Sequence, residues 1–329
     1  MEPEPWDTGR PRSADSQMRR IRTAVIGVGR QGRRHGEKLA GLSEARLVAV
    51  LDADRGRADT VAAELGVDAA ADLTDLAGGT DAAVVATPTP THFEIAAALL
   101  ERGIHVLLEK PLAQTLEQAA ALVELAEARG LVLQVGHLER FNPAVIALAA
   151  RIDNPRFIEA HRIAPFRERG LDVSVVLDLM IHDIDLIHAF AGAPVTHAEA
   201  SGGRVFSDQV DVANARVRFA NGCVANLTAS RVSLKTERTL RIFQDRGYLS
   251  ADLHRKQLTS YTARRPGVVR SPDDVRVEQR RFTAGDALRD ECEAFLAAVA
   301  GKRPTPVSGR VALEALRTAS MIGEMIRDR

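Results

Sequence analysis

Short apolar runs and longer stretches with helical periodicity alternate between residues 23 and 136. Runs that are mainly apolar without interruption are typical of strands buried on both faces of a sheet. They occur at residues 23–27, 46–51, 81–86, 105–109 and 131–136. Helices are predicted between them at residues 29–42, 55–65, 92–102 and 116–129. This order predicts a parallel, doubly wound sheet, which is the architecture of a Rossmann domain.

The pattern changes after about residue 137, where apolar and polar positions begin to alternate. Such alternation predicts strands with one buried and one solvated face, and therefore a mainly antiparallel sheet with an open face. Strands are predicted at 157–163, 195–201, 211–219, 223–230, 239–244, 248–252, 257–261 and 275–282. Helices are predicted at 143–152, 178–190, 286–300 and 310–327. Asn221-Gly222 predicts a hairpin turn between two of these strands.

The length of 329 residues suits two domains. Residues 1–20 are rich in Pro, Ser and charge without periodicity, so we expect a disordered tail, with Met18 as an alternative translation start to Met1. A Rossmann domain is predicted at 21–140. An α+β domain for substrate binding and oligomerisation is predicted at 141–329.

Charge and cysteine content narrow the functional classes. Lysine plus arginine and aspartate plus glutamate each number 44, so the formal net charge is zero. A partner that is nucleic acid or an anionic membrane would normally require a basic surplus. No apolar run approaches the roughly 18 residues of a membrane span. The two cysteines lie far apart and outside any metal-ligand spacing, so we expect a reduced, cytoplasmic protein without a metal site.

A glycine motif lies where the first strand meets the first helix. Residues 27–32 read G-V-G-R-Q-G, which matches the fingerprint of a dinucleotide-binding turn. The glycines let a pyrophosphate approach backbone N–H groups at the helix N-terminus. The cofactor contacts expected from this turn are Gly27, Gly29, Arg30, Gln31 and Gly32.

Asp52 ends the second strand, 20 residues after the last glycine of the motif. A carboxylate at this position accepts hydrogen bonds from both ribose hydroxyls and repels a 2′-phosphate. This favours NAD. Arg55 and Arg57 follow closely and could bind a 2′-phosphate, so NADP stays open.

Three further motifs follow in order along the chain. Residues 87–92 read T-P-T-P-T-H, residues 109–111 read E-K-P, and residues 178–185 read D-L-M-I-H-D-I-D. Together with the fingerprint, this ordered set resembles the glucose–fructose oxidoreductase / inositol dehydrogenase / MocA family over nearly the whole chain from Arg22. Many relatives have glycine where Met180 stands, which would change a pocket wall without removing a reactive group.

The resemblance implies an NAD-dependent dehydrogenase acting on a secondary hydroxyl of a sugar. It implies a catalytic group formed by Lys110, Asp178 and His182, which would also contact the substrate. It implies a homodimer or homotetramer built through the open sheet, and a cis peptide between Lys110 and Pro111. Further cofactor contacts implied by the matching motifs are Thr87, Pro88, His92, Glu109 and Lys110.

The helix motif also has a physical reading of its own. Asp178, His182 and Asp185 are spaced i, i+4 and i+7, which predicts that they share one helical face, whereas Asp183 points elsewhere. Histidine ordinarily titrates near neutrality, so we expect His182 to suit general-base work. Lys110 can hold the substrate oxygen or relay the proton itself, so the identity of the base stays open.

Two segments favour a particular substrate. Residues 136–143 and 172–183 resemble the branch of the family that oxidises the 3-hydroxyl of UDP-N-acetylglucosamine. Arginines near them could bind a diphosphate, because guanidinium groups suit phosphate oxygens. The expected substrate contacts here are Arg140, Asn142, Arg167 and Arg169. The alternatives are an inositol or free-sugar dehydrogenase and a non-catalytic, NAD-binding regulator.

Overall fold

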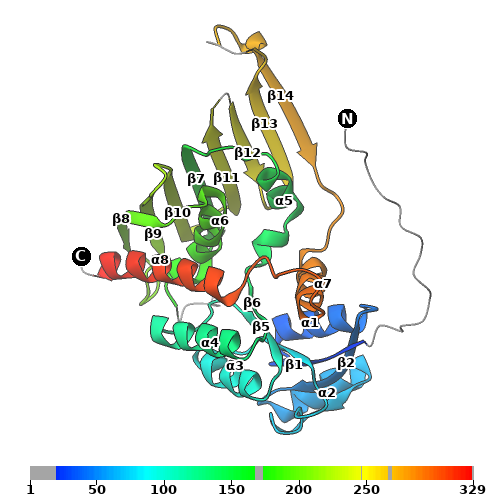
Figure 1. Ribbon diagram of the computed structural model, residues 1–329. Helices are drawn as coiled ribbons and strands as arrows, with labels where there is room; N and C mark the ends of the chain where they lie inside the picture. Colours follow the sequence, from blue (N-terminus) through cyan, green and yellow to red (C-terminus); the bar gives the residue numbers. More distant parts are fainter. Residues whose placement is uncertain (1–19, 167–172, 246, 266–268, 328–329) are drawn as a thin grey trace, which may run out of the picture.

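The computed structural model describes residues 20–166, 173–245, 247–265 and 269–327. The predicted tail at 1–20 therefore lies almost entirely outside the described residues. Figure 1 shows two layered units, a Rossmann domain and a large twisted sheet partly covered by helices. No helix in the described ranges is long and apolar enough to cross a membrane.

The first unit is a six-stranded parallel sheet in the order β3-β2-β1-β4-β5-β6. Its strands are β1 (Ile21–Ile26), β2 (Ala45–Leu51), β3 (Asp68–Ala69), β4 (Ala82–Val85), β5 (His105–Glu109) and β6 (Leu133–Gly136). Its helices are α1 (Arg30–Ala40), α2 (Arg55–Leu65), α3 (His92–Glu101) and α4 (Leu116–Ala128). The prediction of a parallel, doubly wound sheet is confirmed. Strand β3 was not predicted, because two residues are too few to form an apolar run. Successive strands are added outward from β1 on one side and from β4 on the other, so the switch point of the sheet lies between β1 and β4. Ligands are expected at the carboxyl ends of these two strands.

The second unit is an eight-stranded sheet in the order β14-β13-β12-β11-β7-β10-β9-β8. Its strands are β7 (Phe157–Pro165), β8 (Val195–Gly203), β9 (Val212–Phe219), β10 (Val224–Ser233), β11 (Glu237–Gln244), β12 (Gly247–Asp252), β13 (Gln257–Ala263) and β14 (Val275–Arg281). All neighbouring pairs are antiparallel except β7 with β10, which is parallel. The predicted hairpin turn joins β9 to β10, with Gly222 at φ 86°.

Helices cover one face of this sheet. Helices α5 (Pro143–Ala149) and α6 (Ile181–Ala191) lie against it, and α8 (Gly309–Arg327) packs between β8 and α4 of the first unit (Figure 1). Buried side chains of both units form one continuous apolar cluster. The continuity holds the two sheets in a fixed relation, with the cleft described below at their junction.

Helix α7 (Ala287–Val299) departs from a simple division of the chain at residue 140. It packs on α1 of the Rossmann domain, where Phe295 and Leu296 join Leu39 in a second apolar cluster. The chain therefore returns to the first domain after completing the large sheet. The domain boundary between 21–140 and 141–329 stays a prediction. It divides the chain by sequence, whereas α7, which follows the boundary, packs on the first domain.

Candidate active site

A cleft of about 1260 Å³ runs along the carboxyl edge of the Rossmann sheet. At one end it is lined by Asp52 and Arg57, in the middle by the glycine turn, and at the other end by Lys110 and Asp178. The sequence motifs therefore converge on one space.

The glycine turn is shaped by two close approaches. Gly27 has φ 81°, and a Cβ there would lie 2.7 Å from a methyl carbon of Thr87. A Cβ on Gly32 would collide with the carbonyl oxygen of Gly27. Gly29, by contrast, has open space in the direction of its missing side chain. The turn thus leaves room in front of the first N–H groups of α1, where a phosphate would be stabilised.

Asp52 lies at the cleft end of β2 and its side chain is 7% exposed. Its carboxylate accepts hydrogen bonds from the backbone N–H groups of Val28 (2.8 Å) and Asp54 (2.9 Å). Arg57 donates to it at 3.2 Å and also pairs with Asp54. The acid is therefore fixed in orientation, and the cation that could bind a 2′-phosphate is held beside it.

His92 connects two segments of the cleft wall. The ring is buried, with Nδ1 2.8 Å from the carbonyl oxygen of Pro111 and Nε2 2.9 Å from that of Thr87. Thr87, Pro88 and Pro111 line the cleft, whereas His92 does not. The residue predicted to contact cofactor instead fixes the positions of residues that line the space.

Glu109 is likewise placed behind the cleft wall. Its Oε1 lies 3.0 Å from Nε2 of His35, and its side chain is 17% exposed. Glu291 on α7 is buried close to it, and burial together with the charge of Glu109 raises the pKa of Glu291. Glu109 therefore holds His35 on α1, the helix that follows the glycine turn, and does not line the cleft.

Lys110 and Asp178 meet across the junction of the two domains. Nζ of Lys110 donates to the backbone carbonyl of Asp178 at 2.8 Å and to its carboxylate at 3.2 Å. The Lys110–Pro111 peptide is cis, as the family resemblance implies. The pair links β5 of the Rossmann domain to the segment that leads into α6.

That segment is not an ordinary α-helix. Residues Val176–Met180 form a π-helical turn, and α-helical geometry begins at Ile181. The predicted helix at 178–190 therefore starts earlier and with a wider turn, so the i, i+4, i+7 argument does not hold through Asp178. A π-helical turn of this kind often occurs at functional sites. Here the carbonyl of Asp178, within the turn, accepts a hydrogen bond from Lys110.

His182 lies in the first turn of α6. Burial lowers the pKa of its imidazole, and the positive charges of Lys110 and Arg162 lower it further, to well below its usual range. His137 packs edge-on at 6.2 Å between ring centroids. The Nδ1 atom of His182 is buried and has no hydrogen-bond partner among the described residues. The ring is thus neutral near pH 7 and retains an unused polar atom.

Asp185 and Asp183 hold α6 in place. Asp185 is fully buried and receives the guanidinium of Arg140 at 2.5 and 2.8 Å. The carboxylate of Asp183 accepts hydrogen bonds from the guanidinium of Arg162 at 2.8 and 3.0 Å, and Arg162 also pairs with Glu139. The interpretation of Asp183 as structural is confirmed. Asp185 does not share a role with His182, because its carboxylate is occupied by Arg140.

The predicted phosphate ligands are not assembled as the sequence suggested. Arg140 directs both its Nε and Nη2 donors at Asp185 and its carbonyl. Asn142 is buried as the N-cap of α5, with its amide donating to Glu139 and to the carbonyl of Leu253. Arg167 and Arg169 lie outside the described residues. Arg140 and Asn142 therefore have structural roles in this arrangement.

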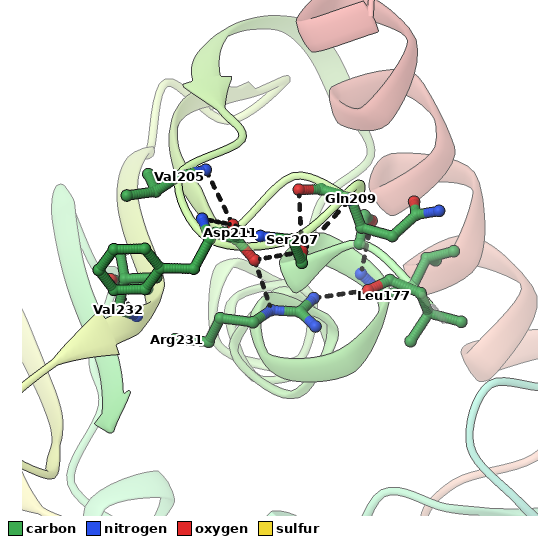
Figure 2. A network of polar contacts seen from close by, with 11 residues as sticks. Leu177, Val205, Ser207, Gln209, Asp211, Arg231 and Val232 are labelled. Carbon is green, nitrogen blue, oxygen red and sulfur yellow. Dashed lines mark hydrogen bonds and ion pairs between the residues drawn. The ribbon is translucent and has the colours of Figure 1, made fainter. Parts of the chain in front are cut away.

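A network of hydrogen bonds centred on Asp211 holds the segment that leads to Asp178. The carboxylate of Asp211 accepts from three backbone N–H groups, at residues 205–207, and from the hydroxyl of Ser207 (Figure 2). Arg231 lies 3.7 Å from the same carboxylate and donates to the carbonyl of Val173 at 2.6 Å. Burial would raise the pKa of Asp211, but these hydrogen bonds hold it well below its usual range. The network therefore connects the start of β9 and Arg231 on β10 to Val173, which lies in the segment before the π-helical turn.

The comparisons with known proteins agree with this geometry. Residues 21–137 match the model of an oxidoreductase family with an NAD-binding Rossmann fold, and residues 144–250 match the Gfo/Idh/MocA C-terminal domain. The chain belongs to the Gfo/Idh/MocA oxidoreductase family.

Relatives of this Gfo/Idh/MocA oxidoreductase act on sugars and polyols. It is 42% identical to a UDP-N-acetylglucosamine 3-dehydrogenase of Acidithiobacillus ferrooxidans, over 91% of this chain and 96% of the relative. A solved structure of a UDP-N-acetylglucosamine 3-dehydrogenase from that organism superposes with a TM-score of 0.87 at 38% identity, covering 94% and 99% of the two chains. A myo-inositol dehydrogenase of Streptomyces leeuwenhoekii is 31% identical over 90% of this chain and 94% of the relative.

Several residues around the site were not identified from the sequence. His137 and His35 lack a recognisable spacing, because their partners are far away along the chain. Arg162 and Arg238 alternate with apolar residues in strands and look like solvated positions, yet both contact Glu139. Only the fold brings each of these residues to its partner.

Proposed function

We propose that the protein oxidises the 3-hydroxyl of UDP-N-acetylglucosamine to the ketone, with NAD as the electron acceptor. The observation that carries this proposal is the contact of Lys110 with Asp178 at one end of a cleft whose other end carries the glycine turn and Asp52. His182 does not line this cleft but lies close enough for the charge of Lys110 to lower its pKa. The similarity to a UDP-N-acetylglucosamine 3-dehydrogenase over nearly the full length of both chains supports the choice of substrate.

The residues present fit a nicotinamide dinucleotide. The unobstructed side of Gly29 faces the start of α1, and Asp52 is fixed at the end of β2 where an adenosine ribose would lie. When bound, NAD accepts a hydride from the substrate carbon. Thr87 and Pro88 would flank it, between the glycine turn and Lys110.

The protein's own contribution is to place the alcohol and remove its proton. His182, neutral because of burial and the neighbouring cations, takes the hydroxyl proton as the C–H bond breaks and the carbonyl forms. The ammonium of Lys110 stabilises the negative charge that develops on the oxygen. Asp178 holds Lys110 from both its carboxylate and its carbonyl. This division of roles follows from the lowered pKa of His182, which leaves it ready to accept a proton.

NAD is preferred to NADP in this proposal. Asp52 would repel a 2′-phosphate, and Arg57 is neutralised by Asp52 and Asp54 rather than free to attract one.

The open face of the large sheet would form a homodimer or homotetramer. A row of aromatic side chains crosses four adjacent strands there, formed by Phe157, Phe243, Tyr248 and Tyr261. The next position of the row, on β14, is Val277, which is 56% exposed. Light scattering coupled to size exclusion should give twice or four times the chain mass, whereas a monomeric mass would remove this part of the proposal.

The experiment is a substrate screen with purified protein and NAD. UDP-N-acetylglucosamine, myo-inositol and glucose are supplied in parallel, and NADH formation is followed by absorbance. We expect turnover with the nucleotide sugar. Turnover with myo-inositol or glucose alone would refute the substrate and leave the dehydrogenase class intact.

A further inference from the structure

A second imidazole, that of His137, packs against His182 and has no part in the mechanism above. We infer that His137 is a positioning residue, which orients the ring of His182 by packing against it, and this inference rests on the proposed function. His137 directly follows β6, at the carboxyl edge of the Rossmann sheet. The two ring centroids are 6.2 Å apart and the rings are nearly perpendicular, at 86°.

The ring of His182 is not held by a hydrogen bond. Its Nδ1 atom is buried without a partner, and neither of its ring nitrogens forms a hydrogen bond within the described ranges. A catalytic histidine is ordinarily oriented by a hydrogen bond from one ring nitrogen to a carboxylate or a carbonyl. Packing has to supply the orientation here, and His137 is the ring that contacts His182 in the described part of the chain.

The backbone around His137 holds its ring in a fixed place. The N–H of His137 donates to the carbonyl of Val135 at 2.8 Å, and the carbonyl of His137 accepts from the N–H of Arg140 at 3.0 Å. The side chain is buried, and burial lowers the pKa of the imidazole, so the ring is uncharged near pH 7. Lys110 is among the charged groups that act on it, so the ring lies near the proposed catalytic lysine as well as His182.

Buried ion pairs flank the contact between the two imidazoles. They join the segment after His137 to α6 through the pair Arg140–Asp185 and the triad Glu139–Arg162–Asp183. The contacts follow the same order along both segments, with positions 137, 139 and 140 matched to 182, 183 and 185. Breaking a buried ion pair leaves an uncompensated charge and is costly. The segment therefore cannot slide along α6, and the two rings keep their relative position.

This arrangement gives residues 136–143 a role other than phosphate binding. Glu139 and Arg140 brace α6, and Asn142 donates to Glu139 and to the carbonyl of Leu253. These contacts keep His137 in place. The segment thus acts on the reaction through the orientation of His182 and not through contact with the sugar.

The test compares two replacements of His137. His137→Ala removes the ring, whereas His137→Phe keeps a flat ring without the nitrogens. In His137→Ala the ring of His182 is free to rotate, so kcat with UDP-N-acetylglucosamine should fall by on the order of 10²-fold, the effect of a misplaced reacting group. The KM for NAD should stay near its wild-type value, because Asp52 lies at the other end of the cleft. His137→Phe should retain most of the activity.

The pKa of His182 supplies a readout that is independent of turnover. It is followed by NMR titration of the imidazole signals, and the spectrum of His182→Ala assigns the signal among the nine histidines. Loss of the His137 ring lets water reach His182, so the pKa should rise in His137→Ala and stay low in His137→Phe. It should stay below the ordinary value of about 6.5, because the charges of Lys110, Arg162 and Arg238 still lower it.

His188→Ala is the matched control. His188 lies on the same helix and packs edge-on against Phe219 at 5.8 Å and 86°, so this variant loses a ring contact of the same geometry. It should leave kcat and the pKa of His182 unchanged. If His137→Ala does not fold, His137→Leu fills the space without a flat ring and should reproduce both changes.

Three results decide the inference and separate it from the proposed function. If UDP-N-acetylglucosamine is oxidised and His137→Ala and His137→Leu leave kcat and the pKa of His182 unchanged, the positioning role is overturned and the function stands. If His137→Phe loses as much activity as His137→Ala, orientation by ring packing is also overturned. If the pKa of His182 depends on the ring at 137 but no nucleotide sugar is oxidised, the positioning role is supported and the proposed function fails.

Discussion

The ammonium of Lys110 lies 2.8 Å from the backbone carbonyl oxygen of Asp178 and 3.2 Å from its carboxylate. The two residues are separated by 68 positions in the sequence and belong to different domains. Asp178 lies in a π-helical turn, an irregularity that often occurs at functional sites. Catalysis in our account depends on this junction.

Replacing Lys110 with methionine tests its role directly. Methionine keeps the length of the side chain and removes the charge, so the developing oxyanion loses its stabilising partner. We expect kcat to fall by about 10²–10⁴-fold. Binding of NAD, measured by fluorescence titration, should change little. Near-normal turnover would exclude Lys110 from the chemical step.

The pH dependence of kcat/KM tests His182. Because burial and the charges of Lys110 and Arg162 lower its pKa, the base is already unprotonated at the pH where a free histidine is half charged, about 6.5. Activity should therefore be constant on moving down to this pH and fall only at more acidic values. His182→Ala should abolish that acidic limb along with most of kcat. A limb with its midpoint at or above 6.5 in the wild type would contradict the assignment.

Cofactor choice is tested by Asp52→Ser. In the wild type Arg57 pairs with Asp52 at 3.2 Å. The serine removes the repulsive carboxylate and frees Arg57 from this pairing. The ratio of kcat/KM for NAD to that for NADP should decrease by about tenfold or more, which corresponds to roughly 1.4 kcal/mol. The double variant Asp52→Ser, Arg57→Ala is the control and should lose the gain with NADP. An unchanged ratio in the single variant would show that Asp52 does not select the cofactor.

Asp211→Asn tests the network that supports the approach to Asp178. Asparagine keeps an acceptor for the N–H groups of residues 205–207 but loses the charge opposite Arg231. The free energy of unfolding at neutral pH should fall by about 1.5–3 kcal/mol, the range for hydrogen bonds to a charged group. Chemical denaturation measures it.

The pH dependence of this effect has a definite sign. The pKa of Asp211 is lower in the folded protein than in the unfolded chain, so its stabilisation is present above the unfolded pKa and disappears as pH falls through the folded one. The difference between wild type and Asp211→Asn should therefore narrow on acidification. A difference that is independent of pH would show that the carboxylate charge is not what stabilises the turn.

Much of the Rossmann half could be predicted because its information is local. Continuous apolar strands, glycines with special backbone needs and an acid at a fixed spacing each carry their own structural meaning. Lys110, Asp178 and His182 were predicted as a group only through the resemblance to a family, because their spacing along the chain does not indicate that they lie close together in the fold.

The failures came from side chains that are held by tertiary and capping contacts. Arg140 and Asn142 carry the right chemistry for a phosphate, yet a buried carboxylate and a helix N-terminus occupy them first. Their commitment depends on tertiary contacts such as that with Asp185, which sequence spacing does not reveal.

The most direct test of the account follows the hydrogen atom at C3 of the sugar. UDP-N-acetylglucosamine labelled with deuterium at C3 is incubated with the enzyme and NAD, and the reduced cofactor is analysed by mass spectrometry. We predict that NADH carries one deuterium and that its formation requires Lys110 and His182. Unlabelled NADH from this substrate, or no NADH at all, would contradict the account.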